Sequence, residues 1–225
     1  FNEITPSTIA FRHWINLDRE LDSILASSSS SNRRNIKKAR KGNFQVVKSS
    51  SRQSLQEFCY LNCLTRKRHG LPPQPDSFFD AVYNNIISKG NGVIFKAVRE
   101  GQTIAASIYF HFHQKAMYKY GASDFRFQNL RANNLIMWRA LKWYHENGFK
   151  ELCLGKTDYR NEGLRRFKMG WGSEEQTIYN TQYHVKERKF FAKDSKTKGF
   201  HNQLFRILPV PLLRLSGNLL YRHMG

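Results

Sequence analysis

Three consecutive strand-like segments in the middle of the chain constrain its fold most. Residues 93–98, 103–113 and 116–122 are rich in apolar, β-branched and aromatic side chains, and short polar turns join them. Connections this short join antiparallel neighbours, because a parallel pair needs a crossover of a dozen or more residues. The sequence therefore predicts an antiparallel meander as the centre of a sheet.

A long amphipathic helix and a short buried strand follow the meander. Leu130, Met137, Leu141 and Tyr144 mark one face of the predicted helix, which Gly148 ends. Residues 151–154, Glu-Leu-Cys-Leu, have the length of a strand buried on both faces. We expect this strand to stop at Gly155 and a functional loop to follow it.

The remaining segments complete a mixed pattern. Strands are predicted at residues 8–17, 44–47 and 177–185, and helices at 18–26, 32–42, 54–69, 77–88 and 162–167. Asn32 is predicted to cap its helix, and Asp158 and Asn161 to cap the last one. This order resembles the GNAT acyltransferase fold, an α/β (α+β) class with a mixed, mostly antiparallel sheet flanked by helices.

The charge of the chain indicates an anionic partner. The 225 residues carry a formal net charge of +20, which attracts nucleic acid, phosphorylated or diphosphate substrates, or an anionic membrane surface. Three cysteines give neither a disulfide framework nor a zinc-like spacing, so a reducing cytoplasm is the expected location. His111 and His113 share one strand face, but without a third ligand hydrogen-bonded histidines are favoured, and no metal is expected.

Two basic segments and an apolar end carry further expectations. The helix at residues 32–42 either is a solvated charged helix or contacts phosphate, and its basic residues include Arg33, Arg34, Lys37 and Lys38. A basic tail follows residue 185, with Lys186, Arg188, Lys189, Lys193, Lys196 and Lys198. The apolar residues 204–225 are broken by Arg206, Pro209, Pro211 and Arg214, so they form an interfacial segment or a packed C-terminal helix, not a membrane-spanning one.

The predicted fold places the active site between two strands. In a GNAT fold the strand carrying Tyr120, Gly121 and Ala122 would splay from the strand ending at Leu154 and Gly155. Splaying leaves backbone N–H and C=O groups unpaired, and these groups can hold an extended, amide-bearing acyl donor. We predict this wedge to be the acyl-donor site.

Three motifs resemble those of the FemAB-type acyltransferases. They are RRNIKKARKG from Arg33, a segment with Thr65, Arg68 and Gly70, and LGKTDYRNEGLRRFKMGWG from Leu154. The core Phe167, Lys168, Trp171 and Gly172 is the most specific part, and the resemblance spans residues 8–185. It implies transfer of an acyl group to an amine or hydroxyl of a cell-envelope precursor, at the cytoplasmic side and in possible contact with the inner face of the membrane.

The resemblance also implies a domain division and two donor types. FemAB-like enzymes generally carry two GNAT-like domains, so residues 1–26 are expected to enter from an upstream one that is missing. Residues 27–185 would form the second domain, and residues 186–225 the basic tail and apolar end. The donor is aminoacyl-tRNA in the best-known members, whereas relatives that serve exopolysaccharide or cellulose systems are described as using acetyl-CoA.

The loop before the long helix bears on the choice of donor. Acetyl-CoA-using GNAT proteins present glycines there, so that backbone N–H groups reach the pyrophosphate. The corresponding stretch begins at Gln128 and has Arg131 and Asn133 at the glycine positions. CoA binding is therefore weakened as a hypothesis, although Arg131 can itself pair with a phosphate. Both co-substrates stay open, and no resident cofactor is expected.

Particular residues are assigned roles by the resemblance and by their chemistry. Lys168 would supply positive charge near the carbonyl of the donor or a terminal adenosine of tRNA, and Phe167 or Trp171 a stacking face. Asp158 is a candidate base, with helix capping as the simpler explanation. The substrate-binding set, which would hold a diphosphate-linked sugar or peptide, consists of Arg33, Arg34, Lys37, Lys38, Asn161, Phe167 and Trp171.

A different class of function also fits the charge. A catalytically inert module that keeps the GNAT fold and binds nucleic acid or the envelope would need only its positive surface. Such binding would weaken steeply with salt and would come with no acyl transfer. The glycine-flanked segment around Lys168 is more specialised than a polyanion binder requires, so the sequence favours the enzyme.

Overall fold

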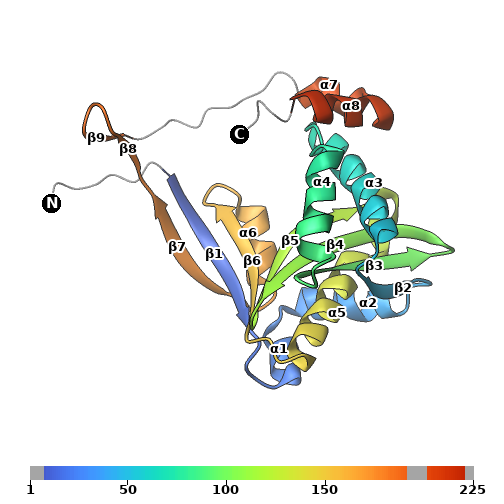
Figure 1. Ribbon diagram of the computed structural model, residues 1–225. Helices are drawn as coiled ribbons and strands as arrows, with labels where there is room; N and C mark the ends of the chain where they lie inside the picture. The colour runs from blue at the N-terminus through green and yellow to red at the C-terminus, as the bar shows by residue number, and fades with distance from the viewer. Residues whose placement is uncertain (1–7, 192–201, 221–225) are drawn as a thin grey trace.

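A computed structural model describes residues 8–191 and 202–220, and its centre is a seven-stranded sheet. The strand order is β2-β3-β4-β5-β6-β1-β7, and every neighbouring pair is antiparallel except β5 and β6 (Figure 1). The strands are β1 (Thr8–Asn16), β2 (Gln45–Ser49), β3 (Gly92–Arg99), β4 (Gln102–Phe112), β5 (Lys115–Ser123), β6 (Glu151–Asp158) and β7 (Glu174–Asn180). A separate ribbon pairs β8 (Gln182–His184) with β9 (Lys189–Phe191).

Helices cover both faces of this sheet. They are α1 (Leu21–Ser27), α2 (Ser30–Arg40), α3 (Arg52–His69), α4 (Asp76–Val82), α5 (Ala132–Glu146), α6 (Glu162–Met169), α7 (Asn202–Ile207) and α8 (Val210–Leu220). A π-helical turn, η1 (Tyr83–Ile87), continues α4, and a 3-10 turn, η2 (Phe125–Leu130), leads into α5. The apolar sides of α1, α2 and α5 pack on one face of the sheet, and those of α3 and α4 on the other.

The alternation of side chains in the meander explains the two cores. In β3, Val93, Phe95 and Ala97 enter the core beneath α5, whereas Ile94 enters the core beneath α3 and α4. Successive side chains of a strand point to opposite faces, so a strand buried on both faces must be apolar throughout. The predicted antiparallel meander and the predicted fold class are confirmed.

Three local predictions are wrong. Gly155 does not end its strand. It lies inside β6, next to a bulge in the pairing with β1, and has a positive φ of 77°. Asn32 is not a cap, because Ser29 accepts the hydrogen bond from the Asn32 backbone N–H and begins α2. The helix predicted at residues 77–88 runs as α4 only to Val82, where the chain widens into η1.

The strand that begins the described chain lies inside the sheet. β1 is inserted between β6 and β7 and is antiparallel to both, so its two edges are hydrogen-bonded along almost its whole length. No pattern in the sequence points to this position. Residues 8–16 are therefore integral to the sheet that holds the site, while the division at residues 26 and 185 stays a prediction.

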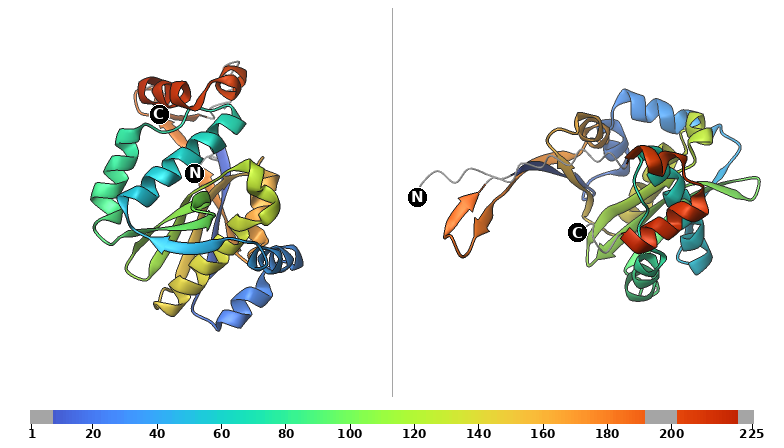
Figure 2. Two further views of the ribbon diagram at one scale, coloured as in Figure 1. Left: turned by 90° about the vertical axis from the view of Figure 1, so that its right-hand side faces the viewer. Right: turned by 90° about the horizontal axis from the view of Figure 1, so that it is seen from above.

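The C-terminal helices α7 and α8 pack beside α3 (Figure 2). Gly217 lies against the Pro73 backbone, and the Arg214 guanidinium pairs with the Asp76 carboxylate at 2.8 Å. The predicted tail residues Lys193, Lys196 and Lys198 lie outside the described residues. None of the helices in the described part of the chain combines the length and apolar character needed to cross a membrane.

Candidate active site

The two parallel strands at the centre of the sheet splay apart, as predicted. β5 and β6 pair only where Lys115–Met117 meet Glu151–Cys153. Beyond that point the strands diverge, and Figure 1 shows β6, β1 and β7 leaning away from β2–β5. A bulge in β5 between Tyr118 and Tyr120 adds to the divergence. The result is a wedge whose open end lies at the C-terminal ends of β5 and β6.

Only the backbone of the predicted β5 segment is directed at the wedge. The Tyr120 ring packs against Phe58 and Phe79 in the core under α3, and Ala122 is buried in the same core. Between them, a Cβ on Gly121 would lie 1.9 Å from the Tyr118 hydroxyl oxygen, so a larger residue cannot fit unless that ring moves. The segment thus offers main-chain groups rather than side chains to a donor.

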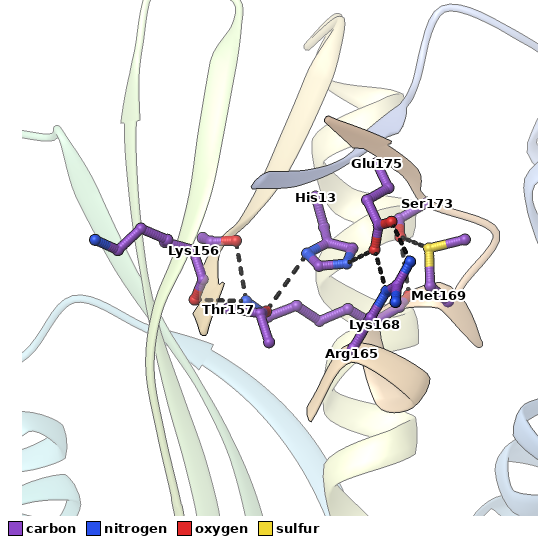
Figure 3. Close-up of polar contacts among 9 residues, drawn as sticks. His13, Lys156, Thr157, Arg165, Lys168, Met169, Ser173 and Glu175 are labelled. Carbon is purple, nitrogen blue, oxygen red and sulfur yellow. Dashed lines mark hydrogen bonds and ion pairs between the residues drawn. The ribbon is translucent and has the colours of Figure 1, made fainter. Parts of the chain in front are cut away.

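The bulge in β6 forms a binding site for the Lys168 ammonium. Opposite β1, His13 pairs with Gly155 and Trp14 with Cys153, which leaves Leu154 as the extra residue. The Lys168 Nζ donates hydrogen bonds to the carbonyl oxygens of Gly155 at 2.9 Å and Lys156 at 3.1 Å (Figure 3). Lys168 reaches them from the last turn of α6, the position that the sequence predicts.

The environment of Lys168 sets its charge. The side chain is only 4% exposed, and burial lowers its pKa to about 8. An ammonium has three N–H groups. Two of them are used by the β6 carbonyl groups, and no hydrogen bond among the described residues uses the third. Lys168 is therefore a buried cation at pH 7 with one hydrogen bond left to donate.

A buried histidine supports the strand that holds Lys168. His13 is fully buried, and its Nε2 lies 2.9 Å from a Glu175 carboxylate oxygen (Figure 3). A carboxylate can only accept, so Nε2 carries the proton and Nδ1 accepts from the Thr157 hydroxyl at 3.5 Å. Arg165 holds Glu175 through two hydrogen bonds of 2.8 and 2.6 Å. These four side chains form a network next to the Lys156 carbonyl group.

The stability of the protein should depend on His13 in mild acid. Burial lowers the pKa of His13, whereas in the unfolded chain it binds a proton near pH 6.5. The unfolded state then binds more protons below about pH 6.5, so the free energy of unfolding should fall as the pH drops from 7 to 5. His13→Gln should remove roughly 1 kcal/mol of this dependence. Urea unfolding at the two pH values measures it.

The matched control for this measurement is His113→Asn, on the exposed β4–β5 turn. Asparagine tolerates the positive φ of 49° at that position. The control should keep the full loss of stability in acid. An unchanged acid dependence in His13→Gln would contradict the assignment of this dependence to the buried imidazole.

Two of the residues predicted to bind the donor, Gln128 and Arg131, lie at the start of α5. Gln128, Arg131 and Phe167 line one cavity of about 150 Å³, together with Ser123 and Asn133. Arg131 adopts a positive φ of 58° just before α5, a conformation that glycine would take without strain. Phe167 points to this cavity, while its neighbour Lys168 turns to β6. Adjacent residues of α6 therefore connect the cavity to the wedge.

Asn32 joins three segments around this cavity, a role that the sequence does not reveal. Its Nδ2 donates to the Gly170 carbonyl oxygen at 2.8 Å, and its Oδ1 accepts from the Asn134 Nδ2 at 3.1 Å. These bonds tie α2 to the end of α6 and to the first turn of α5. In the sequence, Asn32 is only an asparagine next to basic residues, and helix-capping preferences predict it to be an N-cap.

Trp171 does not lie as predicted, and Arg33 makes contacts that the sequence does not reveal. The Trp171 ring is fully buried in the core beneath α5, so it cannot offer a stacking face to a substrate. The Arg33 guanidinium donates hydrogen bonds to the carbonyl oxygens of Ala26 and Ser28. These bonds give partners to backbone carbonyl groups at the end of α1. These bonds use one guanidinium nitrogen, Arg33 is exposed, and its place in the predicted diphosphate-binding set stays a prediction. Arg34, Lys37 and Lys38 are exposed on α2.

Asp158 and Asn161 lie at the exposed end of β6. Asn161 is the N-cap of α6, because its Oδ1 accepts from the Leu164 backbone N–H at 3.1 Å. Asp158 does not cap the helix, and its Oδ1 instead accepts from the Arg160 backbone N–H at 2.9 Å in the turn before it. Its exposed carboxylate stands where the wedge opens, so its role as a base stays a prediction.

Two further features, the His111 side chain and a larger cavity, involve none of the predicted site residues. His111 contacts the Tyr144 hydroxyl at 3.0 Å and the Gly90 carbonyl oxygen at 2.7 Å, so both of its ring nitrogens have partners. No three His, Cys, Asp or Glu side chains gather at a metal-binding distance within the described ranges. A larger cavity, about 1020 Å³, lies at the β4–β5 hairpin beside Phe112 and Met117, at the closed end of the wedge.

The family of the chain follows from a match that covers most of it. Residues 27–176 match the family model of the acetyltransferase (GNAT) domain, and this range contains the wedge, Lys168 and the cavity at α5. The chain belongs to the GNAT family. This membership confirms the predicted fold class and the prediction of an acyltransferase. No curated protein sequence matches the chain.

Solved structures share the fold of this GNAT chain. The crystal structure of FemX has a TM-score of 0.68 at 18% identity, covering 74% of this chain and 59% of FemX. The C-terminal domain of a putative lysylphosphatidylglycerol synthetase from Agrobacterium fabrum has a TM-score of 0.59 at 12% identity, covering 79% and 60%. An aminoglycoside acetyltransferase from an uncultured soil metagenomic sample has a TM-score of 0.51 at 18% identity, covering 64% and 97%.

The likeness to FemX agrees with the FemAB-type resemblance at the level of the fold. The chain spans about three fifths of the length of FemX and of the A. fabrum domain. It spans almost the whole aminoglycoside acetyltransferase chain.

Proposed function

We propose that this chain transfers an acyl group from aminoacyl-tRNA or acetyl-CoA to an amine or hydroxyl of a cell-envelope or exopolysaccharide precursor. The observation that carries the proposal is the buried Lys168 ammonium, held by two carbonyl oxygens at the edge of a splayed strand pair. A polyanion-binding module has no use for a cation hidden from solvent. Similarity to FemX and to a putative lysylphosphatidylglycerol synthetase supports an acceptor from the envelope.

The proposed reaction uses the third N–H of Lys168. The acceptor amine or hydroxyl attacks the ester or thioester carbonyl carbon, and the C=O electron pair moves to oxygen as a tetrahedral intermediate forms. Lys168 donates to this oxyanion, which it stabilises most strongly because the site is shielded from water. Collapse re-forms the C=O bond and breaks the bond to the ribose oxygen of tRNA or the sulfur of CoA, which leaves with the proton that the base has taken from the nucleophile. Asp158 is the proposed base that takes the proton from the nucleophile.

Two features weigh toward aminoacyl-tRNA as the donor. The net charge of +20 favours a large polyanion over a single small cofactor. Arg131 and Asn133 stand at the positions where a CoA-binding loop would present glycines, and they line a cavity of only about 150 Å³. Phe167, which is 38% exposed and lines this cavity, would offer a stacking face to the terminal adenine of tRNA. Acetyl-CoA remains the other donor to test.

The test of the donor is a calorimetric titration of the chain with acetyl-CoA and, separately, with aminoacyl-tRNA, with uncharged tRNA as the control. Mass spectrometry then follows transfer to an amine-bearing envelope precursor. Saturable binding of either donor with mass gain on the acceptor supports acyl transfer. Binding of charged and uncharged tRNA that weakens steeply with salt, without mass gain, would instead favour the inert polyanion-binding module.

The exposed basic face of α2 should serve the acceptor. Neutralising Arg34 and Lys38 together, as Gln, is expected to raise the KM of a diphosphate-linked acceptor about ten-fold with little change in kcat. Their charges would contact the diphosphate in the ground state and the transition state alike. Arg139→Gln with Lys142→Gln on α5 removes the same charge elsewhere, and equal effects of the two pairs would contradict a specific contact.

A further inference from the structure

The outward face of the C-terminal helices is apolar, the reverse of an ordinary surface helix. α8 packs on the body through Leu213 and Gly217, which are buried and four residues apart. On the opposite side of the helix the side chains should be polar if water were the only neighbour. Instead large aliphatic side chains are more than half exposed there and on α7: Leu204, Ile207, Leu212, Leu215 and Leu219.

Positive charge gathers beside these aliphatic side chains. The last turn of α3 carries Arg66, Arg68 and His69, and α7 packs against α3. Arg206 lies in the last turn of α7, and burial together with the charges of Arg68, Arg66 and Arg206 lowers the pKa of His69. The molecule therefore places an apolar stripe and a cluster of cations side by side.

We propose that the surface formed by Leu204, Ile207, Leu212, Leu215 and Leu219, with Arg68 and Arg206 beside it, docks on a membrane that contains anionic lipids. Aliphatic side chains on one helix face enter the boundary between headgroups and acyl chains, while cations at its edge pair with phosphate. Charge complementarity selects this occupant, because a second copy of this strongly basic chain would bring like charges together.

The position of this surface relates it to the wedge. Thr65, one turn before the basic end of α3, exchanges hydrogen bonds with the backbone of Ser123 at 3.1 and 3.3 Å. The Arg68 guanidinium lies 5.2 Å from the centre of the Phe125 ring, which is 60% exposed. Ser123 ends β5 at the open side of the wedge. Resting on the proposed function, docking would hold this opening next to an acceptor carried on a lipid.

Vesicle flotation tests the docking without donor or acceptor. The full chain is mixed with vesicles of phosphatidylcholine alone, or of three parts phosphatidylcholine and one part phosphatidylglycerol, and the floating fraction is measured at low and high salt. We expect strong binding to the mixed vesicles, weaker binding at high salt, and little binding to phosphatidylcholine. Failure of the unmodified chain to float with the mixed vesicles at low salt would overturn the proposal.

Two sets of substitutions separate the apolar and charged contributions. Leu212→Ser, Leu215→Ser and Leu219→Ser combined should weaken partitioning about ten-fold or more, because each removes an inserting side chain. Arg68→Gln with Arg206→Gln should weaken it several-fold and reduce its salt dependence. Phe112→Ser with Val185→Ser, exposed on other elements, should change nothing. Circular dichroism checks that each variant is folded.

The remaining outcomes discriminate between occupants. If the leucine variant floats as well as the unmodified chain, the proposal fails. If the unmodified chain stays with the soluble fraction and sediments as a dimer that the leucine variant loses, the surface binds a second copy instead. Because flotation needs no catalysis, a chain that floats but never transfers an acyl group would leave docking intact and refute only the proposed function.

Discussion

Replacing Lys168 by methionine is expected to lower kcat by about 100- to 1000-fold while leaving the KM for both substrates nearly unchanged. The ammonium is held at 2.9 and 3.1 Å by two carbonyl oxygens of β6 and has one N–H left for the oxyanion. The methionine side chain is similar in length to that of lysine but cannot donate a hydrogen bond. Loss in kcat alone is expected because the oxyanion exists only after attack. Steady-state rates with saturating donor and acceptor measure it.

The control for this variant is Lys156→Met. The Lys156 side chain is exposed, and only its backbone carbonyl group contacts Lys168. It should retain turnover, which would show that loss of a positive charge nearby is not sufficient. Full turnover by Lys168→Met would refute the role of Lys168 in the transfer.

The pH dependence of kcat gives a second readout of Lys168. Burial lowers its pKa to about 8, so the ammonium loses its proton as the pH rises through that value. A donor to the oxyanion must be protonated, and activity should therefore fall above about pH 8. A rise in activity over the same range, absent from Lys168→Met, would mean that the neutral amine acts as a base instead.

Replacing Trp171 by alanine is expected to cost about 3–5 kcal/mol of the free energy of unfolding. The ring is fully buried under α5 and is the largest side chain with no exposure, so its loss leaves a cavity in the core. Trp171→Phe should cost far less. Among the described residues the Trp171 indole N–H has no hydrogen-bond partner, so phenylalanine gives up no bond and relieves an unsatisfied polar group. Urea denaturation measures both.

Phe167→Ala is the matched comparison, at an aromatic residue of α6 four positions before Trp171. Phe167 is partly exposed and lines the cavity at α5, so its loss should change stability by less than about 1 kcal/mol and weaken donor binding instead. If Trp171→Ala were as stable as the unmodified chain but bound donor poorly, Trp171 would be a ligand-facing residue after all.

The elements with the strongest local patterns could be predicted from the sequence. The meander β3-β4-β5, the long helix α5 and the cap of α6 at Asn161 all appear as expected. Each depends on side chains a few residues apart, which alternate across a strand or recur along a helix face. The splay of β5 and β6 was also predicted, because it follows from the order of these elements.

The contacts inside the site depend on residues far apart in the sequence. His13 and Glu175 are separated by 162 positions and meet only because β1 is inserted between β6 and β7. The interpretation of Asn32 as a cap and of Trp171 as an exposed ring fails for the same reason. Local propensity describes an isolated segment, whereas in the folded chain α2 packs on α5 and buries Asn32, and Trp171 enters the core beneath α5.

The sequence by itself determined the family of the fold, the meander and the position of Lys168 in the last turn of α6. These depend on composition and on spacing over a few residues, which every conformation of the chain keeps. Only the tertiary structure decided that Lys168 is buried against the Gly155 and Lys156 carbonyl groups and has a lowered pKa. Burial and charge are properties of the surroundings, and the surroundings of Lys168 come from strands that the sequence does not place together.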